Sequence, residues 1–247
     1  MASLAKRRLS VASAILAIIG GTLFIDAPPS SAEPVDYGLR VTRPGNGVIY
    51  WRFDNSPMQE GGNSVPPFIK ADGKETGLAA VVRAAVNKMN ESIGAGIQLA
   101  YGPAAGVSDG SIPVSVSRVP GTHPTIAAEK PGTAAVTTTT CTAGICTAVI
   151  YINGDLIGAT GDFDSSYDAT TLNDILHEIG HVLGLDHASP LREAANCPEI
   201  MNYGCLGEAH PAELSRAEVA VIKNGYGLGN QRQFTPARWN IFLTGTT

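Results

Sequence analysis

The prediction of fold and function depends above all on the stretch HEIGHVLGLDH, residues 177–187. On a helix, His177 and His181 stand four residues apart and therefore lie on one face, a turn apart. Gly184 can adopt the left-handed backbone conformation that ends a helix. Such a turn would bring His187 back towards the first two histidines. Three imidazoles that converge in this way can bind a transition-metal ion.

A chance origin of this pattern has to be weighed, because HExxH alone occurs in ordinary helices and often marks only a polar face. Here three of the five histidines in the chain fall within eleven residues, at the spacing HExxHxxGxxH. This spacing resembles that of the metzincin zinc peptidases. The resemblance implies that His177, His181 and His187 bind Zn²⁺. It also implies that Glu178 is the general base for a zinc-activated water that attacks a peptide bond.

A second motif, EIMNYG at residues 199–204, follows downstream. Metzincins place a methionine in a tight turn beneath the three histidines, and the resemblance assigns Met201 to that turn; taken alone, Met201 would be a core residue. Tyr203 occupies the place where astacins and serralysins carry a tyrosine that can ligate zinc and stabilise the oxyanion. The LGLDH run and the LSRAEVAVIKNGYG segment resemble matrixins instead. The subfamily is left open, and Tyr203 could equally be a packed side chain.

Periodicity predicts the elements around these motifs. Apolar residues at helical spacing predict a helix over residues 78–93, with Met89 in the core, and a second helix that begins near Thr170. A capping box, Ser215-x-x-Glu218, predicts a final helix. Residues 55–77 are predicted to be a loop. The predicted strands are residues 48–54, 97–101 and 112–119, and a hairpin of residues 134–140 and 146–153.

These elements, with the metzincin resemblance, predict an α/β (α+β) fold. A twisted mixed β-sheet would carry helices packed beneath it, including the active-site helix. A cleft would separate this part from a small C-terminal lobe after Gly184. The threonine run Thr137–Thr140 could form an exposed sheet edge that accepts an extended peptide, or a polar edge that binds nothing.

The N-terminus has the pattern of an export signal. Lys6, Arg7 and Arg8 precede an apolar run, and small residues precede Glu33. We therefore expect a signal peptide at 1–32, an extended lead-in at 33–47, the peptidase domain at 48–228, and a tail at 229–247 that packs on the domain. The mature protein is expected to be secreted, without a stable membrane anchor.

Charge excludes some partners. Removal of residues 1–32 takes away three basic residues and one acidic residue, which changes the formal net charge from −5 to about −7. Such an acidic chain is not expected to bind nucleic acid or anionic membranes. A hydrophobic content of 44% with 16% charged residues is typical of a globular protein and excludes a disordered chain.

The four cysteines, Cys141, Cys146, Cys197 and Cys205, suit two disulfides in an exported protein. Three pairings are open, and proximity in the sequence favours Cys141–Cys146 and Cys197–Cys205. A structural zinc site made of all four thiolates lacks paired CxxC spacing.

Two further groups of polar residues are candidates for a functional role. Asp155, Asp162, Asp164 and Asp168 could supply oxygen ligands to Ca²⁺, although their spacing does not match an EF-hand loop. Asn173 or Asp174 could orient a ligand imidazole by hydrogen bonding to it.

The resulting prediction is a secreted zinc-dependent endopeptidase that acts on proteins or peptides. Two alternatives stay open: a secreted zinc-binding module without catalytic turnover, and a zinc hydrolase of non-peptide amides. Substrate preference and oligomeric state cannot be read from this sequence.

Overall fold

A computed structural model describes most of the predicted domain, and all the described residues belong to one compact unit within 31–247. The predicted signal peptide, the C-terminal tail, Tyr203, Cys197 and Cys205 lie outside the described residues. The described residues are 34–36, 40–42, 47–102, 113–143, 145–157, 169–188, 200–201 and 214–228.

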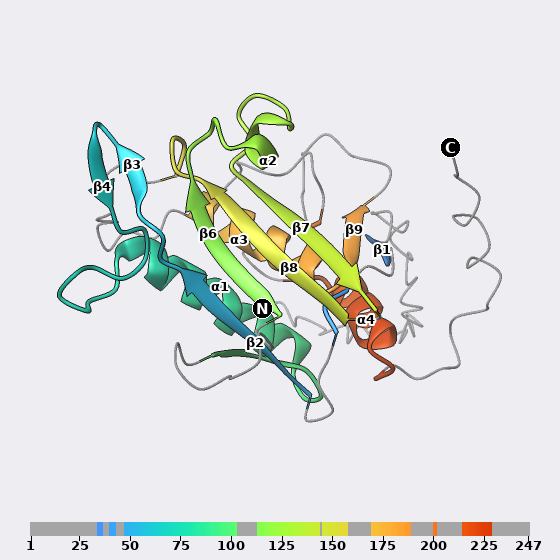
Figure 1. Ribbon diagram of the computed structural model, residues 1–247. Helices are drawn as coiled ribbons and strands as arrows, with labels where there is room; N and C mark the ends of the chain where they lie inside the picture. The colour runs from blue at the N-terminus through green and yellow to red at the C-terminus, as the bar shows by residue number, and fades with distance from the viewer. Residues whose placement is uncertain are drawn as a thin grey trace, which may run out of the picture. The chain divides into compact units, whose positions relative to one another are not determined.

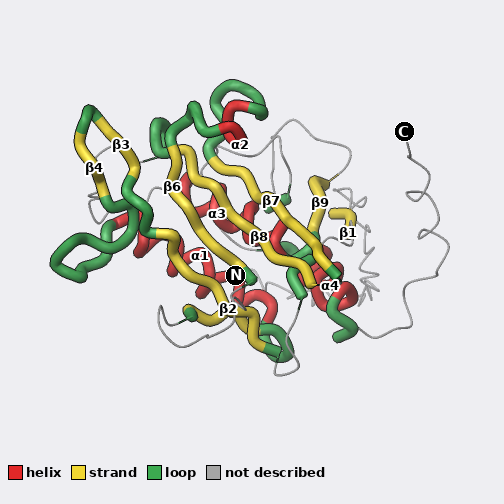
Figure 2. Tube along the Cα trace, viewed as in Figure 1, coloured by secondary structure: helices red, strands yellow, loops and turns green. Residues whose placement is uncertain are grey.

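A five-stranded mixed sheet forms one layer of the fold (Figures 1 and 2). Its spatial order is β5-β2-β6-β8-β7; the first four strands are parallel, and β7 runs antiparallel at the edge. Each strand lies within two residues of its predicted bounds, so the mixed α/β class is confirmed. The strands are β2 (Val48–Asp54), β5 (Gln98–Tyr101), β6 (Val114–Val119), β7 (Ala135–Thr142) and β8 (Ile145–Asn153).

Two helices, α1 (Gly77–Ile93) and α3 (Ala169–Val182), pack together behind the sheet in Figure 1. Both were predicted from apolar residues at helical spacing, and those residues form the core with the inward side chains of the strands. Met89 is fully buried, as predicted. The buried stripe of α3 consists of Leu172, Ile175, Leu176, Ile179 and Val182.

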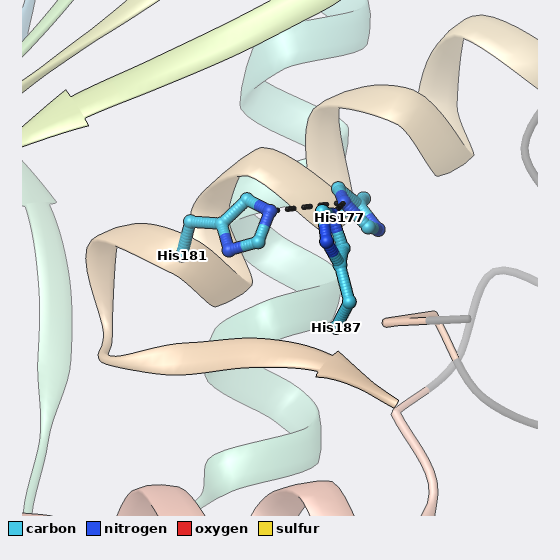
Figure 3. A group of neighbouring side chains, drawn as sticks. All are labelled: His177, His181 and His187. Carbon is cyan, nitrogen blue, oxygen red and sulfur yellow. Dashed lines mark hydrogen bonds between the residues drawn. The ribbon is translucent and has the colours of Figure 1, made fainter. Parts of the chain in front are cut away.

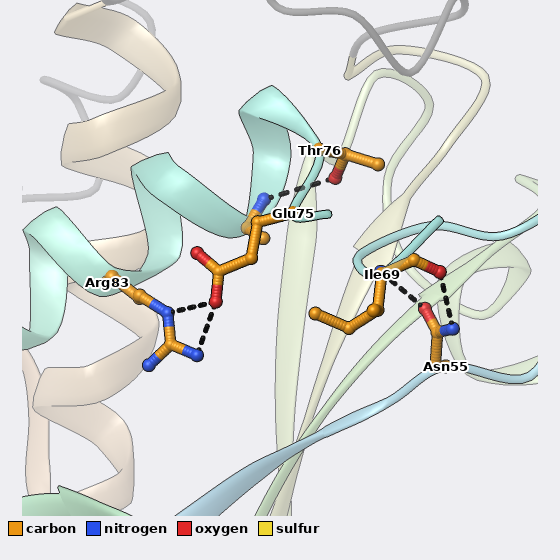
Figure 4. A network of polar contacts seen from close by, with 6 residues as sticks. Asn55, Ile69, Glu75, Thr76 and Arg83 are labelled. Atoms are coloured by element: carbon orange, nitrogen blue, oxygen red, sulfur yellow. Dashed lines mark hydrogen bonds and ion pairs between the residues drawn. The ribbon is translucent and has the colours of Figure 1, made fainter. Parts of the chain in front are cut away.

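The start of α1 is fixed by side chains that cap the helix and tie down the preceding loop (Figure 4). The Thr76 hydroxyl accepts the backbone N–H of Ala79 at 3.3 Å, which satisfies a donor that the helix leaves open. The Asn55 side-chain amide donates to the Ile69 carbonyl, and its oxygen accepts the Ile69 N–H, both at 2.8 Å. Glu75 accepts the Arg83 Nε–H at 2.6 Å. This segment is therefore bonded at several points to the first turns of α1.

The prediction that residues 55–77 form only a loop is wrong in part. A short hairpin, β3 (Met58–Glu60) and β4 (Asn63–Val65), lies within it. Gly61 and Gly62 have φ of 56° and 83°, which is the backbone twist that a two-residue hairpin turn requires. The Gly-Gly pair signalled this turn, but the flanking residues lack the β-branched and aromatic composition by which strands are recognised. A four-residue helix, α2 (Pro124–Ala127), was also missed, and His123 caps it.

The predicted hairpin of β7 and β8 is present, and Cys141 and Cys146 lie opposite each other in it. They form the predicted disulfide. Thr137–Thr140 lie in β7, an edge strand of the described sheet, as predicted; Thr140 is exposed, and the other three are half-buried.

The segment after the predicted cleavage site is bonded to the C-terminal part of the fold. β1 (Pro34–Asp36) pairs antiparallel with β9 (Leu185–Ala188). The Val41 N–H donates to the Val182 carbonyl at the end of α3, at 3.2 Å. Arg40 donates to the Gly225 carbonyl in α4 (Arg216–Gly225). The lead-in is therefore a part of the folded unit.

None of the helices in the described ranges combines the length and apolar character that a membrane crossing needs.

The Tyr226 hydroxyl donates to the Val41 carbonyl at 2.9 Å and so joins α4 to the lead-in. Substitution of Tyr226 therefore measures how much this contact stabilises the fold. Val41 is fully buried, so Tyr226→Phe leaves a buried acceptor short of a donor. We expect a loss of about 1–2 kcal/mol in the free energy of unfolding, measured by denaturant titration. Tyr50→Phe is the matched control, because Tyr50 makes no side-chain hydrogen bond in the described part of the chain. Equal losses in both variants would contradict the anchoring role.

Candidate metal centre

The three predicted histidine ligands converge on one point (Figure 3). His177 and His181 lie one turn apart on α3, and their Nε2 atoms are 3.0 Å apart. Gly184 has a φ of 94°, so it ends the helix in the left-handed region as predicted. The chain then forms β9, in which the Nε2 of His187 lies 3.2 Å from that of His177. The local sequence pattern thus produces the predicted cluster.

Hydrogen bonds at the opposite ring nitrogens determine the tautomers of the first two rings. The Nδ1 of His177 lies 2.8 Å from the Ile200 carbonyl oxygen, and that of His181 lies 2.9 Å from the Leu185 carbonyl oxygen. A carbonyl can only accept, so each Nδ1 carries the proton and donates it. In a neutral ring, each Nε2 is then left with a bare lone pair.

The rings are held in the neutral form by their surroundings. Burial lowers the pKa of His177 well below its usual range, and the neighbouring His181 lowers it further. Burial also lowers the pKa of His181 to about 4, against the opposing effect of its bond to the Leu185 carbonyl. The pKa of His187 is lowered as well, mainly by burial. All three rings are therefore neutral near pH 7.

Two neutral rings with protonated Nδ1 atoms cannot share a hydrogen bond between their Nε2 atoms. The contact drawn between His177 and His181 in Figure 3 would need one imidazolium ring, which burial opposes. A cation between the lone pairs removes the repulsion. Two imidazole nitrogens on one tetrahedral zinc ion would stand roughly 3.3 Å apart. The two spacings to His177, 3.0 and 3.2 Å, are close to this value, and all three ligand atoms lie within 4.8 Å of one another, so the three histidines can hold a metal ion.

Glu178, which follows the first histidine in the sequence, carries a buried carboxyl. Burial raises its pKa to about 7, the nearby charge of Asp174 adds to this, and hydrogen bonds from Thr137 oppose it. Its Oε2 atom is buried and has no hydrogen-bond partner among the described residues. A buried acceptor in this state is costly unless a proton donor or water binds there. A carboxyl with a pKa near 7 can both take up and release a proton at neutral pH.

Met201 is fully buried and packs against α3. A Cβ atom added to Gly180 would stand 2.4 Å from the Met201 Sδ atom, so the missing side chain at Gly180 makes room for the thioether. Gly180 lies between the two helical histidines. Its role was not predicted, although the glycine in HEIGH was visible in the sequence.

The sequence-based candidates for orienting the imidazoles, Asn173 and Asp174, do not hold the Nδ1 atoms of His177 or His181. Main-chain carbonyls of Ile200 and Leu185 do so. No residue-type signal marks a backbone acceptor, so sequence reasoning could not find them. Asn173 and Asp174 are both buried, and Asp174 acts on Glu178 through its charge.

The structure describes only part of the segment that carries the four candidate calcium ligands. Asp155 accepts the backbone N–H of Gly121 at 2.8 Å, which gives it a structural role. Asp162, Asp164 and Asp168 lie outside the described residues, and calcium binding there stays a prediction.

Comparison with known proteins adds little to this geometry. No protein-family model matches the chain, and no curated protein matches it. Among solved structures, the chain is similar to one in the GM1 bound form of the ECX AB5 holotoxin. The identity is 15% and the TM-score 0.41, with 78% of this chain and 87% of that chain covered. A likeness this weak carries no argument about function.

Metal binding can be measured directly on the chain that begins at Glu33. A transition-metal ion at about 100 times its Kd should stabilise the fold by about 2.7 kcal/mol, and a chelator should reverse the gain. His181→Ala should abolish it. His123→Asn is the matched control, because His123 caps α2 away from the cluster and asparagine is also a good cap. Equal metal-induced stabilisation of the wild type and His181→Ala would place the ion elsewhere.

The contact between Gly180 and Met201 predicts a strong coupling between the two positions. Gly180→Ala gains about 1 kcal/mol of helix propensity but forces a clash that costs about 1–3 kcal/mol. We expect a net loss of up to about 2 kcal/mol in the free energy of unfolding. In a Met201→Ala background the clash is removed, so the same substitution should stabilise the protein. Denaturant unfolding of the four proteins gives the coupling, and additive effects would contradict this packing.

Proposed function

We propose that this chain is an exported zinc-dependent endopeptidase of the metzincin type. The observation that carries the proposal is the convergence of three neutral imidazoles, with a buried carboxyl on the residue that follows the first of them. His177, His181 and His187 would hold the ion, and Glu178 would be the general base.

Zinc is the ion that best suits this ligand set. Calcium and magnesium prefer oxygen ligands, whereas neutral imidazoles favour zinc and its neighbours in the transition series. Three histidines leave one tetrahedral position open, which is typical of catalytic rather than structural zinc sites. When bound, zinc would lower the pKa of a water molecule and polarise the scissile carbonyl.

In this proposal the proton transfers belong to Glu178. Its Oε2 takes a proton from the attacking water and then passes it to the leaving amine. A pKa of about 7 suits both steps, because neither protonation state is strongly favoured at neutral pH. The same burial that raises this pKa keeps bulk water from hydrogen bonding to the carboxyl.

The β7 edge is the proposed place for the substrate backbone. An extended peptide can add to a free strand edge through main-chain hydrogen bonds. The Thr137 hydroxyl on β7 donates to the backbone carbonyl of Glu178 at 3.0 Å, so this edge is joined to the helix that carries the general base. β7 spans eight residues and could hold peptide on both sides of a cleaved bond, which favours an endopeptidase.

The finer metzincin features are part of the same proposal. Met201 would form the turn beneath the site, and its packing on Gly180 supports this. Tyr203 would stabilise the oxyanion. Residues 1–32 would direct export, which suits the Cys141–Cys146 disulfide.

Glu178→Gln tests the proposed reaction, because the amide keeps the size of the side chain and removes its basicity. We expect cleavage of unstructured peptides, read by mass spectrometry, to fall by about 10²–10⁴-fold. Metal binding should persist, and His123→Asn should cleave like the wild type. Near-full activity in a zinc-loaded Glu178→Gln protein would refute the assigned base. A folded, zinc-loaded wild type that cleaves no peptide would favour a binding module.

A further inference from the structure

The peptide group between Ile200 and Met201 lies between the metal cluster and a buried carboxylate. Its carbonyl oxygen accepts the Nδ1 proton of His177 at 2.8 Å. Its N–H donates to Oε1 of Glu218 at 2.7 Å. The two bonds leave opposite sides of one planar trans unit, so a single rigid group joins Glu218 to His177.

Glu218 has no exposed surface, and both of its oxygens accept backbone N–H groups. The second bond comes from Ser215 at 2.7 Å and belongs to the capping box of α4. Two accepted N–H bonds are the pattern of an ionised carboxylate. The capping box explains the bond to Ser215. It does not explain the bond to Met201, which lies outside the helix.

We propose that Glu218 is a positioning residue for His177 and acts through the Ile200–Met201 peptide group. The proposal rests on the proposed function to the extent that His177 binds the metal. Groups that orient a ligand histidine through its second nitrogen tune metal affinity. Glu218 does not contact the imidazole itself. It binds the N–H of the peptide group whose carbonyl accepts the His177 proton, and so fixes the plane of that group.

Two physical effects give this contact its role. A charge-assisted bond to the N–H polarises the peptide, which makes its carbonyl a stronger acceptor for the His177 proton. The same bond stops the peptide plane from rotating, so the imidazole keeps its Nε2 directed at the other two rings. His181 has its own acceptor, the Leu185 carbonyl, and does not depend on Glu218.

Glu218→Gln tests the proposal with little change in shape. The new side chain has one acceptor oxygen and one N–H₂ donor, so it cannot accept from both Met201 and Ser215 as a carboxylate does. Ser215→Ala is the matched control. It removes the hydroxyl that caps α4 but leaves the bond between Glu218 and Met201 in place. Melting temperatures show how much each variant destabilises the fold.

Two readouts separate positioning from general destabilisation. The first is the Kd for zinc, measured by competition with a chelator; we expect Glu218→Gln to weaken binding about tenfold. The second is the NMR resonance of the His177 Nδ1 proton, in the metal-free and the zinc-loaded protein. It should move upfield in Glu218→Gln, because the hydrogen bond weakens, and stay in place in Ser215→Ala.

Equal losses of zinc affinity in both variants would overturn the proposal, because they would reflect poorer docking of α4. An unchanged Kd and an unchanged Nδ1 resonance in Glu218→Gln would overturn it as well. A wild-type protein that binds no zinc would refute the proposed function instead. The metal-free resonance would then still decide whether Glu218 acts on His177.

Discussion

The rest of this structure depends on holding three neutral imidazoles with their lone pairs facing one another. The Nε2 atoms of His181 and His187 lie 3.0 and 3.2 Å from that of His177, an arrangement that is repulsive without a cation. Burial prevents the rings from relieving the repulsion by taking up protons. The surrounding scaffold holds the three rings in this arrangement. It does so with a helix that fixes two of the rings, a glycine turn, and carbonyl acceptors that fix ring orientation.

Segments far apart in the sequence provide that scaffold. The strand that carries His187 pairs with β1 at the start of the predicted mature chain. The end of α3 accepts a hydrogen bond from Val41, and α4 reaches the cluster through Glu218 and the Ile200–Met201 peptide group. The N-terminal lead-in and α4, which are hydrogen-bonded to each other, thus both support the proposed metal centre. The three rings thus come from one short segment, whereas the contacts that support them come from distant parts of the chain.

The sequence predicted the elements whose signal is local. The helix with His177 and His181, the left-handed Gly184 and the capping box at Ser215 each depend on a few neighbouring residues, and all are present. The contacts that orient the rings could not be predicted, because a carbonyl such as that of Ile200 carries no residue-type signature. The pairing of β1 with β9 escaped prediction because both strands are short and join residues about 150 positions apart, where periodicity gives no information.

Two buried glutamates lie close to this site, and their surroundings give them opposite properties. Glu218 accepts a backbone N–H group through each of its oxygens, which stabilises its charge. Glu178 lies in an environment that raises its pKa to about 7, and one of its oxygens has no partner among the described residues. A carboxylate that accepts backbone N–H groups on both oxygens is suited to hold its neighbours in place, whereas one with an open oxygen and a pKa near 7 can exchange protons. The hydrogen bonds around each carboxyl, rather than the residue type, therefore separate the supporting role proposed for Glu218 from the chemical role proposed for Glu178.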